Sequence, residues 1–350
     1  AVLSARGALR SGAGIVRVSV PEELFPIIQV GVPEAICVSR MLPPDGLGEY
    51  QAIVIGPGLG DEISNVSLIK MVLEGAGKAV VLLDADGLNL TARSKELQDA
   101  VFAMRERLII TPHPGEAARL LDCTTEAINR NRTTAVHLLA EKIGTAVVLK
   151  GAGTLVATPD QKTYINTTGN PGMATGGSGD VLSGIIGALA GQGLSCFEAA
   201  AAGAYIHGLA GDMAAENLGE YGIIATDIAT MTALALHNIF IYIQMYMSRY
   251  IAGEKTLDRG GLMSNRKKII TSLPESLLEQ VDSVVKEDHK NRSELIREAL
   301  VLYLTDRRKK QIRREMVEGY QNMGDLNQSL SEDGIGADLA DLKQYELNLK

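Results

Sequence analysis

The sequence predicts an α/β protein built on a mostly parallel sheet with helices covering both faces. Up to about residue 225, short runs of β-branched residues alternate with amphipathic segments such as 62–75 and 125–143. Near-continuous apolar strands separated by helices are typical of a parallel sheet that is buried on both sides. The expected strands are residues 14–20, 52–60, 79–87, 108–116 and 146–151. Several end in glycine or proline turns, where ligands of such sheets bind.

Composition sets the class of protein. Of the 350 residues, 46% are apolar, which is ample for a packed core, and the net charge is −8. Cys37, Cys123 and Cys196 are odd in number and form no CxxC pair, so we expect a reducing, cytoplasmic location. The chain begins at Ala1 within an apolar pattern, and we expect its original start to be missing.

The stretch NTTGNPGMATGGSGDVLSG, residues 166–184, is the first candidate site. Its glycines allow positive φ angles and close approach to a ligand, and a helical pattern starts at Asp180. A glycine-rich loop that leads into a helix N-terminus suits an anion such as phosphate. Asp180 would repel a phosphate, unless its carboxylate faces a substrate hydroxyl beside the phosphate and removes the proton. We therefore predict that Asp180 is a catalytic base.

Four glycine-containing motifs follow one another along the chain: GPGLG at 56–60, TPHPGE at 111–116, KGAGT at 150–154 and NPGMATGGSGD at 170–180. Together they make residues 1–228 resemble the ADP-dependent NAD(P)H-hydrate dehydratases, which are ribokinase-like enzymes that repair hydrated nicotinamide cofactors. The resemblance implies that ADP phosphorylates the hydroxyl of the S-epimer of the hydrate. Loss of phosphate then restores NADH or NADPH, so that AMP and phosphate are released. It also implies Mg²⁺ as a cofactor.

The same resemblance implies the binding residues. Those implied for the hydrate are Ala1, Gly58, Gly60, His113 and Asp180. Those implied for the nucleotide are Lys150, Gly151, Ala152, Gly153, Thr154 and Gly179. The chemistry agrees with these roles, because a lysine supplies positive charge near phosphate and glycines let the backbone approach it. Pro112 and Pro114 would fix the direction of the His113 imidazole.

Other interpretations of these residues remain open. Asp180 could be only a helix N-cap, and residues 150–154 could form a plain β-hairpin with an exposed lysine. Glu116 could hold magnesium through water or cap the following helix, and Asp84 and Asp86 could stabilise a turn or contact substrate. We assign no residue as a direct metal ligand.

The chain departs from the family pattern at both ends. The opening strand with its glycine-rich turn is absent before Ala1, which would expose a sheet edge and remove part of the substrate wall. After about Asp227 the usual closing helix gives way to residues 229–262, whose apolar part is about twenty residues long. Polar residues interrupt this run, so we interpret it as a linker or translated intergenic segment rather than a membrane span.

Residues 263–312 resemble a ribbon–helix–helix antitoxin of the kind paired with endoribonuclease toxins. Such proteins dimerise through a strand and place the paired ribbon in the DNA major groove. The resemblance implies DNA contacts from Lys268, Ile270, Ser272 and Ser293. Residues 263–314 hold 13 Lys/Arg against 8 Asp/Glu, whereas 315–350 hold 2 against 8. We expect residues 313–350 to be an acidic toxin-binding tail.

Three functions follow from these observations. The first is a repair lyase joined to an operator-binding module that makes the chain a homo-oligomer. The second is a small-molecule kinase of the same fold, because Asp180 and the anion loop would serve simple phosphoryl transfer. The third is a transcription regulator with an inert N-terminal part.

Residues 259–261, Arg-Gly-Gly, lie shortly before Met263. Their codons can spell a ribosome-binding site, so we hypothesise that two genes are joined by a frameshift near residue 228. A natural bifunctional protein with a helical linker is the alternative. The two-gene hypothesis predicts that residues 229–262 pack poorly against either domain.

Overall fold

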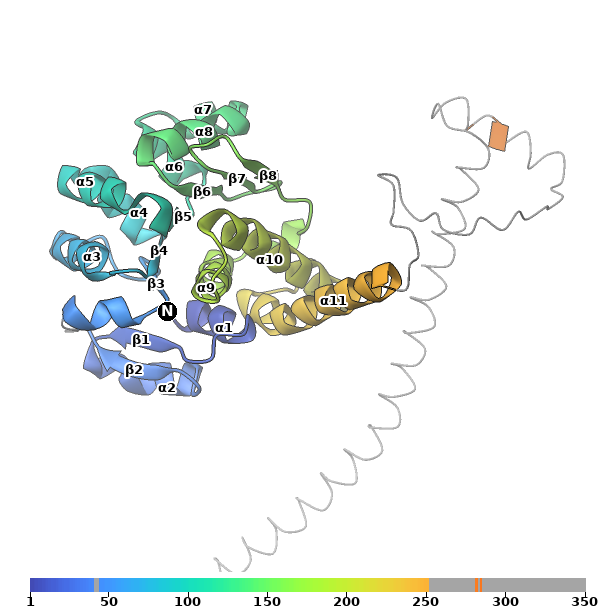
Figure 1. Ribbon diagram of the computed structural model, residues 1–350, viewed down its shortest axis with the longest axis horizontal. Coiled ribbons are helices and arrows are strands. Elements are labelled where there is room, and N and C mark those ends of the chain that lie inside the picture. Colours follow the sequence, from blue (N-terminus) through green and yellow to red (C-terminus); the bar gives the residue numbers. More distant parts are fainter. Residues whose placement is uncertain (41–43, 252–280, 283, 285–350) are drawn as a thin grey trace, which may run out of the picture. The chain divides into compact units, whose positions relative to one another are not determined.

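The computed structural model describes residues 1–40, 44–251, 281–282 and 284 (Figure 1). The chain divides into two units, residues 1–256 and 257–350. Lys268, Ile270, Ser272 and Ser293, together with most of 263–312 and all of 313–350, lie outside the described residues.

The first unit is built around a six-stranded sheet with the order β3-β4-β5-β6-β7-β8. Strands β3 to β6 are parallel, and β7 and β8 continue the sheet as antiparallel strands. These strands are β3 (Ala52–Ile55), β4 (Val80–Leu83), β5 (Leu108–Ile110), β6 (Ala146–Leu149), β7 (Leu155–Ala157) and β8 (Thr163–Ile165). A separate parallel pair is formed by β1 (Arg17–Val20) and β2 (Ile36–Ser39).

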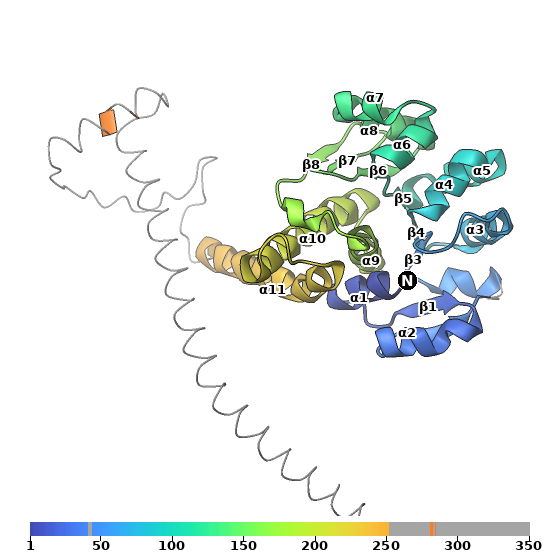
Figure 2. The same cartoon turned by 180° about the vertical axis from the view of Figure 1, so that it is seen from behind.

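Helices cover both faces of the sheet, as Figures 1 and 2 show from opposite sides. The helices against one face are α3 (Ser64–Gly75), α4 (Asp86–Arg93), α5 (Lys95–Met104), α6 (Pro114–Leu121), α7 (Thr125–Arg130) and α8 (Arg132–Ile143). Those against the other are α9 (Ser178–Gly191), α10 (Cys196–Leu218) and α11 (Ala225–Ile251), with α1 (Val2–Arg10) packed on α9 and α11. Helix α2 (Phe25–Gly31) packs on β2. The predicted fold class is thereby confirmed.

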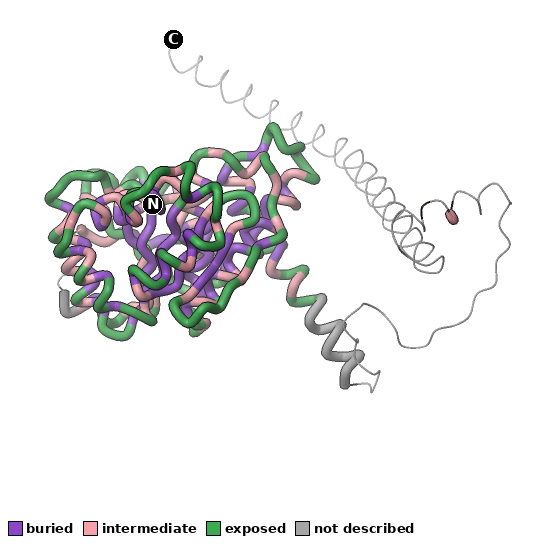
Figure 3. The backbone as a smooth tube through the Cα atoms, turned by 90° about the horizontal axis from the view of Figure 1, so that it is seen from above, coloured by how far each residue is buried: buried purple, intermediate pink, exposed green. Residues whose placement is uncertain are grey.

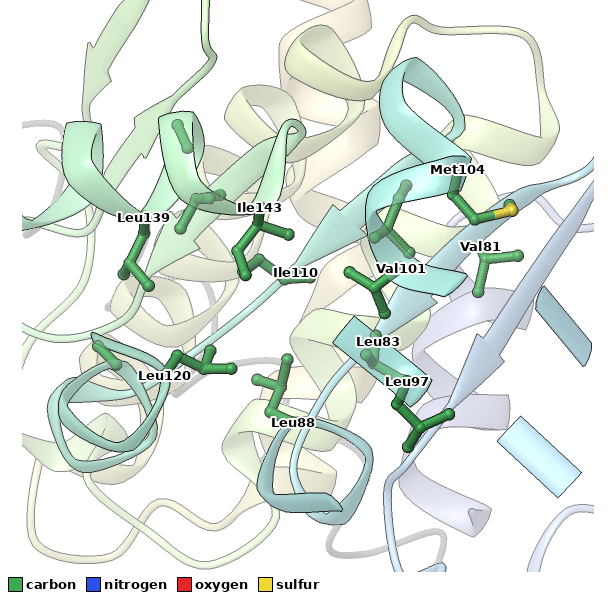
Figure 4. Packing of buried hydrophobic residues seen from close by; sticks show 14 of the residues in the cluster. Val81, Leu83, Leu88, Leu97, Val101, Met104, Ile110, Leu120, Leu139 and Ile143 are labelled. Atoms are coloured by element: carbon green, nitrogen blue, oxygen red, sulfur yellow. The ribbon is translucent and has the colours of Figure 1, made fainter. Parts of the chain in front are cut away.

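The central strands show why the sheet is covered twice. Val81 and Leu83 of β4 belong to one hydrophobic cluster, whereas Leu82 between them belongs to the other. Successive side chains of a strand point to opposite faces, so a strand that is apolar throughout needs a covering layer on each side. Figure 4 shows the cluster that contains Val81 and Leu83, in which Leu97 and Val101 of α5 also lie. Buried segments run through the centre of the unit in Figure 3.

Three strands were not predicted from the sequence. Strands β2, β7 and β8 contain only three or four residues each, and two residues of β8 are exposed. Such short strands give too few positions for a periodic pattern to be recognised. The predicted segment 125–143 is likewise two helices, because Asn131 interrupts it and its side chain caps α8 by accepting a hydrogen bond from the Thr134 N–H.

The expected boundary after residue 228 falls inside α11, which runs from Ala225 to Ile251 without interruption. Ala229, Thr232 and Ala235 are at most 1% exposed, so residues 229–235 pack as part of the first unit. The expectation that all of 229–262 packs poorly is therefore wrong for these first residues. The sequence misled because the helical apolar pattern continues across the point where the motif resemblance ends.

Within the part of the chain that the structure describes, no helix has the length and apolar character needed to cross a membrane.

Candidate active site

The predicted site residues gather at the carboxyl ends of the parallel strands. The turns that follow β3, β4, β5 and β6 meet there, and the N-terminus of α9 faces them. Lys150 after β6, Asp84 after β4 and Glu116 after β5 are linked by ion pairs, and Ser183 of α9 bonds to Asp84. This is the edge at which a parallel α/β sheet binds its ligands.

The glycine turn after β3 is held in a fixed shape. Gly56 has φ +118°, and a Cβ there would collide with the Asp84 carbonyl oxygen, so the two turns cross at a point where only glycine fits. Gly60 also has positive φ, and its N–H donates to Asp86 Oδ2 at 2.8 Å. A Cβ atom placed at Gly58, which has φ +66°, would have no neighbouring atom within 4 Å. Gly58 therefore offers an open surface, while the Gly60 N–H is already engaged.

Asn65 near the start of α3 supports the same turn. Its side-chain Nδ2 donates to the carbonyl oxygens of Leu59 and Gly60, at 3.0 Å each. Its Oδ1 accepts a bond of 2.6 Å from Arg40, and the residue is 6% exposed. The turn is thus braced before any ligand binds.

Asp84 is a buried support rather than a surface residue. It is 1% exposed, and Oδ1 accepts bonds from Lys150 Nζ at 2.6 Å and from the Ala85 N–H at 2.8 Å. Oδ2 accepts a bond of 2.5 Å from Ser183 Oγ. Ala85 itself has φ +48°, a strained conformation for a non-glycine residue, which the bonds on either side maintain. Asp84 and Asp86 therefore both hold turns in this structure.

Lys150 directly follows β6 and starts the turn of a hairpin to β7, but it is not an exposed lysine. Its side chain is 18% exposed, and Nζ lies 2.6 Å from Asp84 and 3.7 Å from Glu116. A Cβ atom at Gly179 would lie 3.6 Å from Nζ, so the ammonium group sits beside the first turn of α9. The hairpin interpretation is correct for the backbone and wrong for the lysine.

The turn after Lys150 presents backbone to solvent. Gly151, Ala152 and Gly153 are exposed, with φ +137° and +60° at the two glycines, and Thr154 Oγ1 donates to the Gly151 carbonyl at 2.9 Å. Arg132 lies under this turn and donates to the carbonyl oxygens of Leu149 at 3.1 Å and Lys150 at 3.3 Å. A Cβ atom at Gly151 would lie 2.9 Å from Arg132 Nη1, and the φ of +137° would strain any other residue there.

His113 and Glu116 form a reciprocal cap on α6. His113 Nδ1 accepts bonds from the N–H groups of Gly115 and Glu116, and Glu116 Oε2 accepts one of 2.8 Å from the His113 N–H. Because Nδ1 is an acceptor, the proton of the neutral ring lies on Nε2. Burial, with Lys150 and Arg119 adding to it, lowers the pKa of His113, so the ring is neutral at pH 7. Half of the side chain remains exposed.

Asp180 does not cap α9. The N-cap is Gly177 with φ +85°, and Asp180 is the third residue of the helix. Its half-buried carboxylate makes no hydrogen bond or ion pair with the residues that the structure describes. Burial is the main cause that raises the pKa of Asp180, with Asp84 and Asp86 adding to it and Lys150 opposing it. An unengaged carboxylate with a raised pKa is suited to accept a proton.

Ala1 and Gly179 complete the predicted set. Ala1 is exposed and directly precedes α1. Gly179 is the second residue of α9, where helix geometry leaves the N–H without a partner in the helix. These N–H groups and the helix dipole suit an anion.

The carboxylates that lie deepest in this site are already engaged with other groups of the protein. Among the described residues, no three His, Cys, Asp or Glu side chains are grouped so that they could hold a metal. Asp84 already accepts from Lys150, Ala85 and Ser183, and Glu116 is used in the cap of α6. Burial raises the pKa of Glu116, which further disfavours its use as a free anionic ligand.

Sequence reasoning did not single out several residues that shape this site. They are Arg40, Gly56, Asn65, Arg132, Ser183 and His207. The glycine motif carried a signal for Gly56, but the others are single polar residues within helices or loops. Nothing in their spacing indicates the distant backbone groups to which they bond.

Two parts of the chain match the sequence profiles of known families. Residues 1–233 match the sequence profile of a family described as NAD(P)H-hydrate dehydratase. Residues 271–307 match that of the ribbon–helix–helix proteins of the copG family.

Among curated relatives, the ADP-dependent (S)-NAD(P)H-hydrate dehydratase of Neisseria meningitidis is 41% identical over 65% of this chain and 77% of its own length. The bifunctional NAD(P)H-hydrate repair enzyme of Coxiella burnetii is 45% identical over 65% of this chain and 45% of its own length. The chain thus spans less than half of that bifunctional relative.

A solved structure shows the same fold. It is the ADP/ATP-dependent NAD(P)H-hydrate dehydratase of Bacillus subtilis co-crystallised with ATP and Mg²⁺. Its TM-score is 0.57 at 27% identity, over 68% of this chain and 84% of that one. The profile match covers well over half of the chain and spans the glycine motifs that lie at the carboxyl edge of the sheet. By its first 233 residues, the chain belongs to the NAD(P)H-hydrate dehydratase family.

Proposed function

We propose that residues 1–233 catalyse the ADP-dependent dehydration of the S-epimer of NAD(P)H hydrate, which restores NAD(P)H and releases AMP and phosphate. One observation carries this proposal. Asp180 presents an unengaged carboxylate of raised pKa at the N-terminus of α9, beside the Lys150 ammonium group. A base and an anion site are thereby adjacent, as transfer of a phosphoryl group to a hydroxyl requires.

In the proposed reaction, ADP supplies the phosphoryl group and leaves as AMP. Asp180 takes the proton of the hydrate hydroxyl, whose oxygen forms the new bond to phosphorus while the bond to AMP breaks. The N–H groups at the start of α9 and Lys150 hold the negative charge of the transferring group. In the second step the carbon–oxygen bond breaks, phosphate departs with the bonding electron pair, and the adjacent carbon gives its proton to water, so that the double bond forms.

The binding roles proposed above divide between the two sides of the site. The open surface at Gly58 and the exposed half of His113 are proposed to contact the hydrate. The exposed turn at residues 151–154 is proposed to contact the nucleotide. We propose that magnesium is held chiefly by the phosphates, with Glu116 contacting it at most through water, and we assign no step to the ion.

Product analysis tests the function. The full-length protein is incubated with (S)-NADPH hydrate and ADP. The reduced nicotinamide is measured by its absorbance, and free phosphate and AMP are measured in the same samples. Equal yields of all three support the dehydratase. A phosphorylated product without free phosphate would identify a small-molecule kinase, and no turnover with either ADP or ATP would favour a regulator with an inert N-terminal part.

For the C-terminal part, we propose that residues 263–312 form a dimeric operator-binding module and that residues 313–350 bind an endoribonuclease toxin. The ribbon–helix–helix profile match at 271–307 and the excess of basic residues support the DNA-binding role. The acidic composition of 313–350 supports the toxin-binding role. We also propose a cytoplasmic location, which agrees with free thiols at Cys37, Cys123 and Cys196.

A further inference from the structure

Helix α10 lies behind the glycine-rich loop, and one of its residues reaches the first turn of α9. His207 is 9% exposed, and its Nε2 lies 3.0 Å from the main-chain oxygen of Ser178 and 3.3 Å from Ser178 Oγ. A carbonyl oxygen can only accept, so Nε2 carries the proton and donates it. The contact joins two residues that are 29 positions apart in the sequence.

The bonded carbonyl belongs to the peptide group that also contains the Gly179 N–H. A peptide group is planar and trans, so its C=O and N–H point in opposite directions. By holding the Ser178 oxygen on the buried side, His207 turns the Gly179 N–H toward the open end of the helix. Asp180 directly follows Gly179, so the position of this peptide group also affects the position of the Asp180 side chain.

The rest of the loop is fastened to α10 in the same manner. The Asp212 carboxylate accepts bonds from the Gly169 N–H at 2.9 Å and from Asn170 Nδ2 at 3.0 Å. Thr168 Oγ1 donates to the Tyr205 carbonyl at 2.9 Å. These contacts hold the loop before it reaches Gly177, whereas His207 alone among them acts on the first turn of α9.

The imidazole remains uncharged in this position. Burial is the main cause that lowers the pKa of His207 to about 4, with the Lys150 charge adding to it and the bond to Ser178 opposing it. At neutral pH the ring is therefore a hydrogen-bond donor without adding a second positive charge beside Lys150.

We propose that His207 is a positioning residue for phosphoryl transfer: its Nε2–H holds the Ser178–Gly179 peptide group so that the Gly179 N–H and the Asp180 carboxylate face the reacting groups. This inference rests on the dehydratase function proposed above and adds a residue on α10 to it. His207 acts through the peptide group and does not itself touch substrate.

Three variants of the full-length protein test the proposal. His207→Phe removes the donor, and His207→Gln keeps an N–H of similar reach. Thr145→Val is the control, because Thr145 is 1% exposed and bonds to the Leu108 carbonyl at the opposite end of the strands. Its loss of a buried hydrogen bond lowers stability without touching the site.

The kinetic readout separates positioning from folding. We expect His207→Phe to lower kcat about 100-fold, the loss expected from a misplacement of roughly 1 Å, with little change in KM for ADP. His207→Gln should recover most of that loss, and Thr145→Val should keep the wild-type kcat below its melting temperature. Equal kcat values for His207→Phe and Thr145→Val, or no recovery by glutamine, would overturn the proposal.

A spectroscopic readout decides the inference without turnover. The chain contains three Ser–Gly pairs, Ser11–Gly12, Ser178–Gly179 and Ser183–Gly184. Labelling serine carbonyl with ¹³C and glycine with ¹⁵N therefore leaves three resolved peptide signals. His207→Phe should shift the Ser178–Gly179 signal and leave Ser11–Gly12 unchanged, while Thr145→Val moves neither. An unshifted Ser178–Gly179 signal in His207→Phe would overturn the proposal. If that signal shifts but the wild-type protein shows no turnover, the dehydratase function is contradicted instead.

Discussion

Lys150 Nζ lies 2.6 Å from Asp84 Oδ1, although the two residues are 66 positions apart and follow different strands. The aspartate is 1% exposed and the lysine side chain 18%, so the pair is nearly removed from water. A buried charge that loses its partner is costly, whereas a satisfied pair fixes the position of both groups. This pair places the ammonium group beside Gly179.

Asp180→Asn is expected to abolish turnover while leaving ADP binding nearly unchanged. The amide keeps the shape of the helix start but cannot accept a proton, and loss of a positioned base costs about 10²–10⁴-fold in rate. Steady-state kinetics and calorimetric titration with ADP measure the two effects. An Asp180→Asn protein with wild-type turnover would remove Asp180 from the mechanism.

Lys150→Ala is expected to weaken ADP binding and to lower the free energy of unfolding by about 3–5 kcal/mol, because Asp84 is left buried without its partner. The double variant Asp84→Asn with Lys150→Met is the control. It should regain much of the stability but not the affinity for ADP. If Lys150→Ala changed only the affinity for the hydrate, the assignment of Lys150 to the nucleotide would be wrong.

Stability should fall in acid because of His207. Its pKa is about 4 in the folded protein and about 6.5 in an unfolded chain, so unfolding takes up a proton between these values. The stability that comes from keeping His207 neutral is fully present above about pH 6.5, and it is lost progressively as the pH falls to about 4. Between pH 7.5 and pH 5 the loss is about 2 kcal/mol.

Urea unfolding of the wild type and of His207→Gln at the two pH values isolates this contribution. Glu116 and Asp180 have raised pKa values and act in the opposite direction, but they are present in both proteins. The wild type should therefore lose about 2 kcal/mol more than the variant. Equal losses would show that His207 does not titrate as a buried neutral ring.

Limited proteolysis tests how the two halves are joined. Residues 229–235 should be protected, because Ala229, Thr232 and Ala235 are buried. If the following residues up to 262 are translated intergenic sequence, early cleavage should fall among them, and codons 259–261 should contain an AGGAGG-like run. CGN at codon 259 together with protease resistance throughout 229–262 would instead establish a natural bifunctional protein.

Residues 263–350 expressed alone are expected to form a dimer that binds DNA from their own upstream region. Binding should weaken steeply as salt rises, because basic side chains displace counterions from the phosphates. Fluorescence anisotropy at several salt concentrations measures the slope. A monomer, or an affinity that does not depend on salt, would contradict the ribbon–helix–helix prediction.

The fold class follows from the sequence alone, and the glycine motifs predict where the candidate site lies. Apolar runs such as Val80–Leu83 identify strands buried on both faces. Alternate side chains of a strand point to opposite faces, so a run without polar residues has no face suited to water. The glycine motifs identify the turns at the carboxyl ends of those strands. Asp180 could be predicted as the base because its carboxylate would repel a phosphate bound at the same helix N-terminus. That repulsion is avoided if the carboxylate faces a substrate hydroxyl beside the phosphate.

The tertiary structure alone decided how these groups are held. Asp84 contacts Lys150 and Ser183, and His207 contacts Ser178, across 66, 99 and 29 residues of sequence. No local pattern encodes such pairs, because the partner is a distant side chain or a backbone carbonyl that every residue carries. Their geometry follows only when strands and helices pack, which is also why burial, and not residue type, sets the raised pKa of Asp180 and the lowered pKa of His207.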